Sequence, residues 1–198
     1  FTQNLSLLKK VEQEENILDN FQQSIISYLI LISEKNLDAM QIAEYPVLLH
    51  SVNDVEHIGD YTKNIAKFGK TKIEKKLKPY SLSSKKQTHK MFALVYQLFD
   101  LVIYSFQNKD HESAKKALII EDKIDKMKIE IRANYIKTLK DPKNNPQSEL
   151  QIVDIANNLE KIGDCLHNIA QAVLRDLKWI DKQENTNLKN PVLTKPLI

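Results

Sequence analysis

A chain of 198 residues with a net charge of +3 is long enough for one compact domain or two small ones, and its composition is that of a soluble globular protein. It holds only 3 glycines and 6 prolines, too few for the many turns of a β-sandwich or an α/β sheet, so the composition favours helix. A single cysteine excludes an intramolecular disulfide and favours a reduced, cytosolic setting. No apolar run approaches the roughly 20 residues that span a bilayer. The sequence opens at Phe1 with a helix-like segment, which we interpret as a piece of a longer chain or a processed product.

Five helical segments follow from the spacing of apolar residues and from the positions of helix breakers. We expect the second helix to end at Gly69, and Pro142 and Pro146 mark the turn between the fourth and the fifth. Because such helices are marginally stable alone, they must pack on one another. The predicted helices are 3–35, 38–68, 84–108, 111–140 and 147–181, followed by a flexible tail or docking peptide at 183–198.

The segment between the second and third predicted helices is strongly basic, with ten lysines and one acid between Lys63 and Lys90. It is either a solvated linker, 70–83, or a strip that lies against an anionic membrane surface. Nucleic acid is the weaker alternative, because no arginines or interleaved aromatic residues accompany the lysines. The candidate membrane contacts are Lys70, Lys72, Lys75, Lys76 and Lys78.

An internal repeat organises the chain. Residues 53–66 recur as 157–170, with eight of fourteen positions identical and no gap, and an upstream motif at 15–19 recurs at 121–125. A repeat of this kind indicates two copies of one structural unit. We therefore predict an all-α fold of two tandem antiparallel three-helix bundles. The first repeat is 1–69, with two helices in this chain and a leading helix upstream of Phe1, and the second is 84–182, with three.

Pairs of Glu and Asp four residues apart recur at repeat-equivalent places. Two such residues stack on the same face of a helix, one turn apart. Within each unit, the two pairs are about equally far from the turn that joins their helices, so antiparallel packing brings all four carboxylates to one level. We expect these acidic faces to point away from the apolar core. The residues are Glu15, Asp19, Glu56 and Asp60 in the first unit, and Glu121, Asp125, Glu160 and Asp164 in the second.

Four carboxylates at one level repel one another, so something must offset their charge. The nearby lysines are one candidate, namely Lys63, Lys123, Lys126 and Lys161, and a solvated face of Glu–Lys pairs is the alternative interpretation. A divalent or trivalent cation is the better offset, because clustered carboxylates suit Mg, Mn, Ca or Fe and also admit Zn. Additional ligands or residues that support them would be Asn53, Asn64, Asn157, Asn168 and His167. His57 lies beside the acidic face, and we interpret it as a surface or capping residue.

Two glycines, Gly59 and Gly163, lie inside the repeated motif and in the middle of predicted helices. Each costs roughly 1 kcal/mol relative to alanine there. Close approach of a neighbouring helix beside the acidic face is the compensation that we expect.

The pattern Glu-x-Ile-Gly-Asp-x-x-x-Asn-Ile-Ala, present twice with an upstream Glu-x-x-x-Asp in each half, resembles the PhoU family. The run Val52 to Asp60 is similar to the PhoU-like cytosolic tail of bacterial sodium/phosphate cotransporters, and the resemblance covers most of residues 5–181. It implies tandem three-helix bundles whose acidic motifs, at the eight carboxylates named above, bind metal clusters. The arginine that usually follows the third-helix Glu in this family is replaced by His57 and Lys161, which puts in doubt the contact made by that arginine.

The resemblance also implies a function. A PhoU-like domain would be a metal-binding regulator of phosphate uptake rather than an enzyme, with Fe, Mn, Zn or Mg as cofactor. Its partners would be a transporter membrane domain, an anionic membrane surface and further copies of itself, at the cytoplasmic side of the inner membrane. The alternatives are a free-standing PhoU-like phosphate-signalling regulator and a metal-free helical scaffold for protein binding. A dimetal enzyme is disfavoured because the chain lacks the Glu-x-x-His motif of such bundles.

Overall fold

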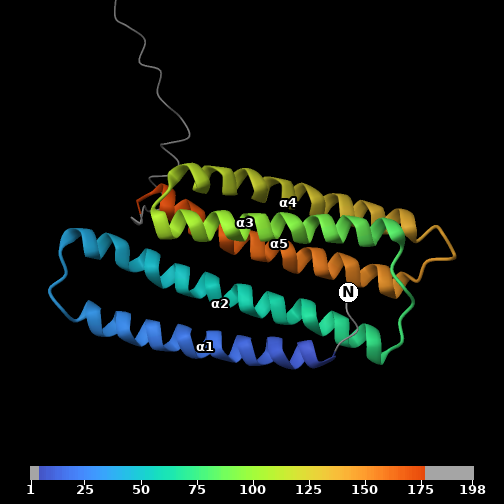
Figure 1. Ribbon diagram of the computed structural model, residues 1–198, viewed down its shortest axis with the longest axis horizontal. Helices are drawn as coiled ribbons and strands as arrows, with labels where there is room; N and C mark the ends of the chain where they lie inside the picture. The colour runs from blue at the N-terminus through green and yellow to red at the C-terminus, as the bar shows by residue number, and fades with distance from the viewer. Residues whose placement is uncertain (1–4, 177–198) are drawn as a thin grey trace, which may run out of the picture.

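The computed structural model describes residues 5–176, and all of the regular structure in that range is helical, as predicted (Figure 1). The expected tail at 183–198, and the expected helical residues before 5 and after 176, lie outside the described residues. The five helices are α1 (Leu5–Ser33), α2 (Ala39–Glu74), α3 (Leu82–Asn108), α4 (His111–Thr138) and α5 (Pro146–Leu174).

Polar side chains set the starts of the helices. Asp38 accepts a hydrogen bond from the backbone N–H of Gln41, whose side chain accepts one from the backbone N–H of Asp38. This capping box satisfies two N–H groups that a helix start otherwise leaves unpaired. Asn145 caps α5 in a similar way, with Pro146 at the first helical position, where its fixed φ suits a helix.

We predicted that the second helix ends at Gly69, but it continues to Glu74. A glycine costs a helix about 1 kcal/mol without preventing it, and the residues that follow Gly69 are compatible with helix. Lys70 and Glu74 lie one turn apart with 4.0 Å between charged atoms, and Ile73 is partly buried. The basic segment is therefore partly helical.

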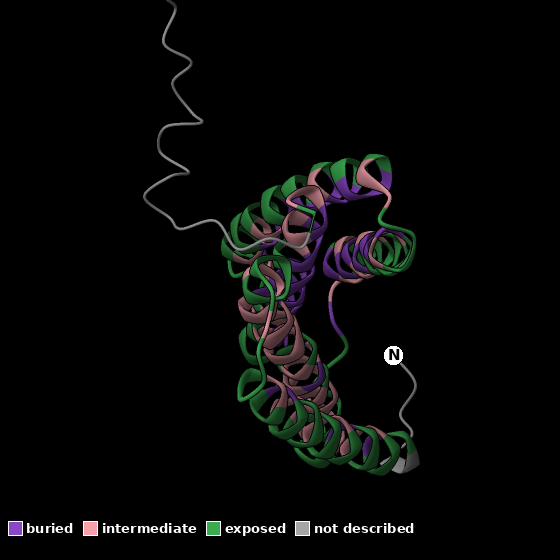
Figure 2. Cartoon of the chain, turned by 90° about the vertical axis from the view of Figure 1, so that its left-hand side faces the viewer, coloured by how far each residue is buried: buried purple, intermediate pink, exposed green. Residues whose placement is uncertain are grey.

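The helices form a curved row with one helix inside the curve. In order of contact the row is α1, α2, α5 and α4, while α3 packs against α4 and α5. Figure 2 looks along the helices and shows the curvature, with α3 on the inner side. The contact between α2 and α5 joins the two repeats.

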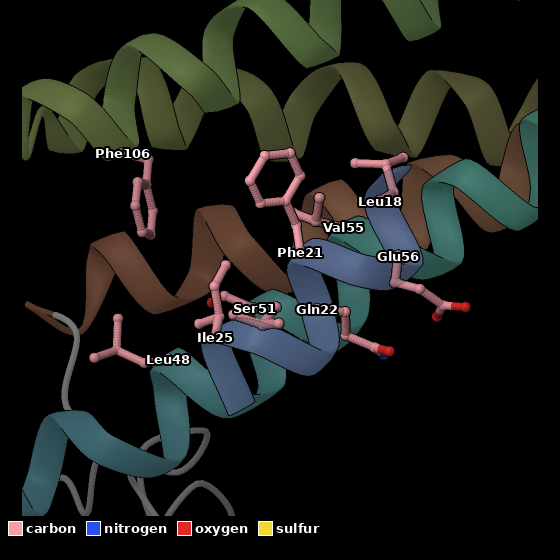
Figure 3. Close-up of a pocket in the computed structure, with 10 residues that line it drawn as sticks. Leu18, Phe21, Gln22, Ile25, Leu48, Ser51, Val55, Glu56 and Phe106 are labelled. Atoms are coloured by element: carbon pink, nitrogen blue, oxygen red, sulfur yellow. The ribbon is translucent and has the colours of Figure 1, made fainter. Parts of the chain in front are cut away.

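The buried core lies in the second repeat, and the equivalent face of the first repeat is open. Phe21 and Ile25 of α1 are 61% and 41% exposed, whereas Met127 and Ile131, their repeat equivalents in α4, are 4% and 1% exposed. In the second repeat α3 covers this face. In the first, among the described residues, an apolar groove remains, lined by Leu18, Phe21 and Ile25 of α1, by residues of α2 and by Phe106 of α3 (Figure 3).

Candidate metal centres

The first acidic cluster forms where α1 and α2 pack antiparallel. The structure brings Glu15 and Asp19 of α1 to Glu56 and Asp60 of α2, as the symmetry about the turn predicted. Burial, followed by the charges of Asp60, Asp19 and Glu15, raises the pKa of Glu56. The protein thus holds several negative groups close together in a partly desolvated place.

A lysine from α2 offsets part of this charge. Lys63 Nζ lies 2.5 Å from Oε1 of Glu15, a carboxylate that is almost fully buried. The other oxygen of Glu15, Oε2, and Oδ1 of Asp19 are buried and have no hydrogen-bond partner within residues 5–176. Buried carboxylate oxygens without partners carry a large desolvation cost, and a bound cation would remove that cost.

The second acidic cluster repeats this arrangement between α4 and α5. Glu121, Asp125 and Asp164 each offer an oxygen, and these atoms lie within 4.8 Å of one another. Burial, followed by the charges of Glu160 and Asp164, raises the pKa of Asp125. Burial and the charges of Asp125 and Asp164 also raise the pKa of Glu121, although His167 opposes the change.

Two lysines contact the second cluster. Lys128 Nζ lies 2.8 Å from Glu160 Oε1, and Lys161 Nζ lies 2.7 Å from Asp164 Oδ2. Lys161 Nζ also forms an ion pair with Glu160 Oε2 at 3.5 Å, and in the described part of the chain that buried oxygen accepts no hydrogen bond. The prediction that nearby lysines offset the charge of the carboxylates is therefore confirmed in part. Lys63 and Lys161 contact carboxylates, whereas Lys123 and Lys126 are exposed without such a contact in the described chain.

The acidic residues do not form outward faces, and here the prediction was wrong. Glu15, Glu121 and Glu160 are each less than 9% exposed. The reason is that each cluster lies at the seam between two antiparallel helices, where the partner helix covers the glutamates. The aspartates lie nearer the rim, with Asp125 exposed and Asp164 partly buried.

The close helix approach that we predicted for both glycines of the repeat is present at Gly59, whereas a Cβ atom on Gly163 would meet only ordinary contacts. A Cβ atom on Gly59 would lie 2.7 Å from Leu18 Cδ1 and 3.9 Å from Glu15 Cγ. On Gly163 it would lie 3.6 Å from Ile124 Cγ2 and 3.9 Å from Glu121 Cγ. Each glycine thus faces an apolar residue and a glutamate at repeat-equivalent positions of the neighbouring helix. The buried glutamate therefore lies next to the helix that carries the other two acids of its cluster.

The additional candidate ligands divide into three groups. His167 does reach the second cluster, with Nδ1 3.0 Å from Glu121 Oε2. Asn53 accepts a hydrogen bond from Gln22, and Asn168 donates one to Asp54 of the other repeat. Asn64 and Asn157 make no hydrogen bond to the carboxylates within residues 5–176.

The lysines of the basic segment do not all face solvent. Lys72 Nζ lies 3.7 Å from the ring centroid of Tyr80 and donates to the carbonyl of Lys78, and burial lowers the pKa of Lys72. It is held within the molecule, whereas Lys75, Lys76 and Lys78 are exposed. Membrane contact by the segment stays a prediction. Among the described helices, none has the length and apolar character to cross a bilayer.

A third group of metal-ligating side chains lies between the repeats and was not predicted. Asp54 and His57 of α2 and Cys165 of α5 each offer a ligand atom, all within 4.8 Å of one another. Burial, with the charges of Asp54 and Asp164, raises the pKa of the Cys165 thiol to about 12. The repeat gave no signal for this group, because the equivalent positions hold Asn158, Lys161 and Tyr61.

These features define a tandem-repeat helical protein in which each repeat holds a carboxylate cluster beside a mid-helix glycine. The PhoU domain model matches residues 1–68 and 88–173, so the chain belongs to the PhoU family. The resemblance in the repeated motif is thereby confirmed at the level of the family.

Known PhoU proteins are similar to this chain over most of its length. The phosphate-specific transport system accessory protein PhoU homolog 1 of Thermotoga maritima is 26% identical over 174 residues, which is 87% of this chain and 74% of that protein. The crystal structure of PhoU from Pseudomonas aeruginosa superposes with a TM-score of 0.79 at 18% identity, covering 88% of this chain and 84% of that one. The structure of the phosphate transport system regulatory protein PhoU from Streptococcus pneumoniae superposes with a TM-score of 0.72 at 19% identity. The superposition covers 89% of this chain and 82% of that one. The two structures support the tandem bundle fold.

Proposed function

We propose that this protein is an accessory regulator of phosphate transport that binds metal ions at its two acidic clusters. The names of its relatives support the regulatory part, since the Thermotoga maritima protein is an accessory protein of phosphate-specific transport. They favour a separate PhoU-like accessory protein over our first expectation, the cytosolic tail of a sodium/phosphate cotransporter.

The observation that carries the metal proposal is that each acidic cluster contains a buried carboxylate oxygen with no hydrogen-bond partner among the described residues. These oxygens are Glu15 Oε2 and Asp19 Oδ1 in the first cluster and Glu160 Oε2, which lies 3.5 Å from Lys161 Nζ, in the second. A solvated face of Glu–Lys pairs does not require burial of these groups. A cation held by several carboxylates would use the free oxygens and reduce the mutual repulsion.

The donor atoms limit the class of metal. Clustered carboxylate oxygens suit Mg, Mn or Fe, and the imidazole of His167 beside Glu121 extends the choice at the second cluster to Zn. Residues Glu15, Asp19, Glu56 and Asp60 would hold the metal in the first unit, and Glu121, Asp125, Glu160 and Asp164 in the second. The bound cation would supply positive charge at the seam between two helices, so its presence would change how those helices pack.

Titration with Mn²⁺ tests the metal sites. We expect Glu160→Gln with Asp164→Asn to remove binding at the second cluster and Glu56→Gln with Asp60→Asn to remove it at the first. The fifth Glu-x-x-x-Asp pair, Glu34 and Asp38, spans the turn outside both clusters and provides a matched control. Its Gln/Asn variant keeps an N-cap residue for α2 and should bind like the parent. Binding that survives in both cluster variants would overturn the metal proposal.

Regulation is tested separately, in cells. We propose that the chain acts on the membrane domain of a transporter at the cytoplasmic side of the inner membrane, with the exposed lysines of the basic segment near anionic lipid. The uptake rate of labelled phosphate should change when the gene is removed and return with the parent chain. It should not return with a chain that carries both cluster variants. An unchanged uptake rate after removal would contradict the regulatory part while leaving the metal result intact.

A further inference from the structure

We infer that Asp54, His57 and Cys165 form a separate binding site for a zinc-class divalent cation at the contact between the two repeats. This site shares no ligand with the acidic clusters, and it stands independently of the proposed function. It lies where α2 packs on α5, so a bound ion would connect the repeats directly.

The geometry of the three side chains is close to that of a metal site. Their ligand atoms all lie within 4.8 Å of one another. Bonds of about 2.0–2.3 Å in a tetrahedral zinc site place neighbouring ligand atoms roughly 3.3–3.8 Å apart. The ligands therefore need to close by only about 1 Å. His57 can supply that movement, because its side chain is about half exposed.

Surrounding groups orient two of the three ligands. Asn168 Nδ2 donates a hydrogen bond of 3.2 Å to Asp54 Oδ1 from the opposite repeat. His57 Nε2 lies 3.6 Å from Glu56 Oε2, and a carboxylate beside a ligating histidine is a common support for its ring orientation. Glu56 belongs to the first acidic cluster, so His57 links that cluster to the contact between the repeats.

The ligand set selects a softer ion than the acidic clusters do. A thiolate and an imidazole favour zinc or cobalt over magnesium or calcium. Burial and the charges of Asp54 and Asp164 raise the pKa of the Cys165 thiol in the chain without metal. A bound cation would reverse that local electrostatic preference and bind the thiolate. One carboxylate, one imidazole and one thiolate leave a fourth tetrahedral position for water.

The repeat makes the site unique within the chain. The positions related to Asp54, His57 and Cys165 hold Asn158, Lys161 and Tyr61. A lysine cannot ligate a metal while it is charged, so the related place on the other side of the contact cannot form a second copy. One equivalent of a thiophilic ion should therefore bind here.

Cobalt titration of the full chain tests the inference. Co²⁺ bound by a thiolate absorbs in the near ultraviolet through sulfur-to-metal charge transfer, and Cys165 is the single cysteine. We expect this band to saturate at one equivalent per chain and to be displaced by Zn²⁺. The band should disappear in Cys165→Ser. In His57→Gln the apparent affinity for Co²⁺, measured from the same band, should fall at least tenfold. His111→Gln, a histidine at the start of α4, should leave the band unchanged.

The double variant Glu160→Gln/Asp164→Asn separates this site from the second acidic cluster. The charge-transfer band should persist in that variant even when Mn²⁺ binding at the second cluster is lost. Absence of a band in the parent chain, or a band unaffected by His57→Gln, would overturn the inference. Loss of the band in the double variant would place the thiolate in the acidic cluster and would also overturn it. Circular dichroism of each variant checks that the helices are retained.

Discussion

Lys63 contacts Glu15 in the first repeat at the same place where His167 contacts Glu121 in the second. Lys63 Nζ is 2.5 Å from Glu15 Oε1, and His167 Nδ1 is 3.0 Å from Glu121 Oε2. Lys63 and His167 are equivalent in the repeat, as are the two buried glutamates. In both units, therefore, a side chain at the equivalent position offsets the charge of the equivalent buried glutamate. In the first unit that side chain is a permanent cation, and in the second it is a group that can also ligate metal.

This relationship predicts that the two clusters differ in metal affinity. Lys63 competes with a cation for Glu15, whereas neutral His167 can join the ligand set. We expect Lys63→His to raise the affinity of the first cluster for Mn²⁺ or Zn²⁺ by about tenfold or more, and His167→Lys to lower that of the second by a similar factor. Calorimetric titration of each variant, with the other cluster removed, measures both effects. Equal affinities in parent and exchanged chains would contradict the assignment.

The raised carboxyl pKa values predict an unusual dependence of stability on pH. Burial and neighbouring acids raise the pKa of Glu56, Glu121 and Asp125. A carboxyl group with a raised pKa binds protons more readily in the folded chain than in the unfolded chain, so stability falls as pH rises through that pKa. Without metal, the midpoint temperature of thermal unfolding should therefore increase when the pH is lowered from 7 to 5.

Bound metal should reverse that trend, because protons compete with it for the same oxygens. Saturating Mn²⁺ should therefore stabilise the protein at pH 7 more than at pH 5. Asp110 and Glu112, whose pKa values are lowered, would lose their stabilising effect only below the ordinary carboxyl range. A midpoint that falls on acidification without metal would show that the clusters carry no excess protons.

The three glycines should respond differently to alanine. A Cβ on Gly69 meets nothing within 4 Å, and one on Gly163 meets only ordinary contacts, so both variants should be more stable by about 0.5–1 kcal/mol. On Gly59 the Cβ would lie 2.7 Å from Leu18 Cδ1, and this crowding should cancel the gain. Urea unfolding with unchanged m-values measures the differences. A stabilisation of Gly59→Ala equal to that of Gly163→Ala would contradict the close approach of α1 to α2.

The open groove predicts that equivalent isoleucines contribute unequally to stability. Ile131 is 1% exposed, and Ile131→Ala should cost about 2–4 kcal/mol through lost burial and a cavity. Its repeat equivalent, Ile25, is 41% exposed, so Ile25→Ala should cost less than about 1 kcal/mol. Equal losses in urea unfolding would mean that something covers the groove in solution.

The repeat made the fold and the acidic clusters predictable. The Glu–Asp spacing and its symmetry about two turns are enough to place Glu15 with Glu56, and Glu121 with Glu160. The burial of those glutamates did not follow from spacing, because helical periodicity gives the face of a residue but not what covers it. The continuation of α2 past Gly69 depends on local helix formers that outweigh one glycine.

The group formed by Asp54, His57 and Cys165 was beyond the reach of the sequence. Its members come from helices of different repeats, separated by more than 100 residues, and their repeat equivalents have different chemistry. Only the packing of α2 on α5 brings them together. The repeat therefore revealed the sites that are duplicated and gave no information about the one that is not.

The metal content of the protein is the most direct test of whether the paired Glu-x-x-x-Asp motifs are metal sites. The full chain is purified without chelators or a histidine tag and measured by elemental mass spectrometry. We expect at least one equivalent of Mn, Fe or Zn per chain, with less in each cluster variant and the same amount in the Glu34/Asp38 control. A chain that contains no metal, and takes up none when these ions are added, would contradict this expectation.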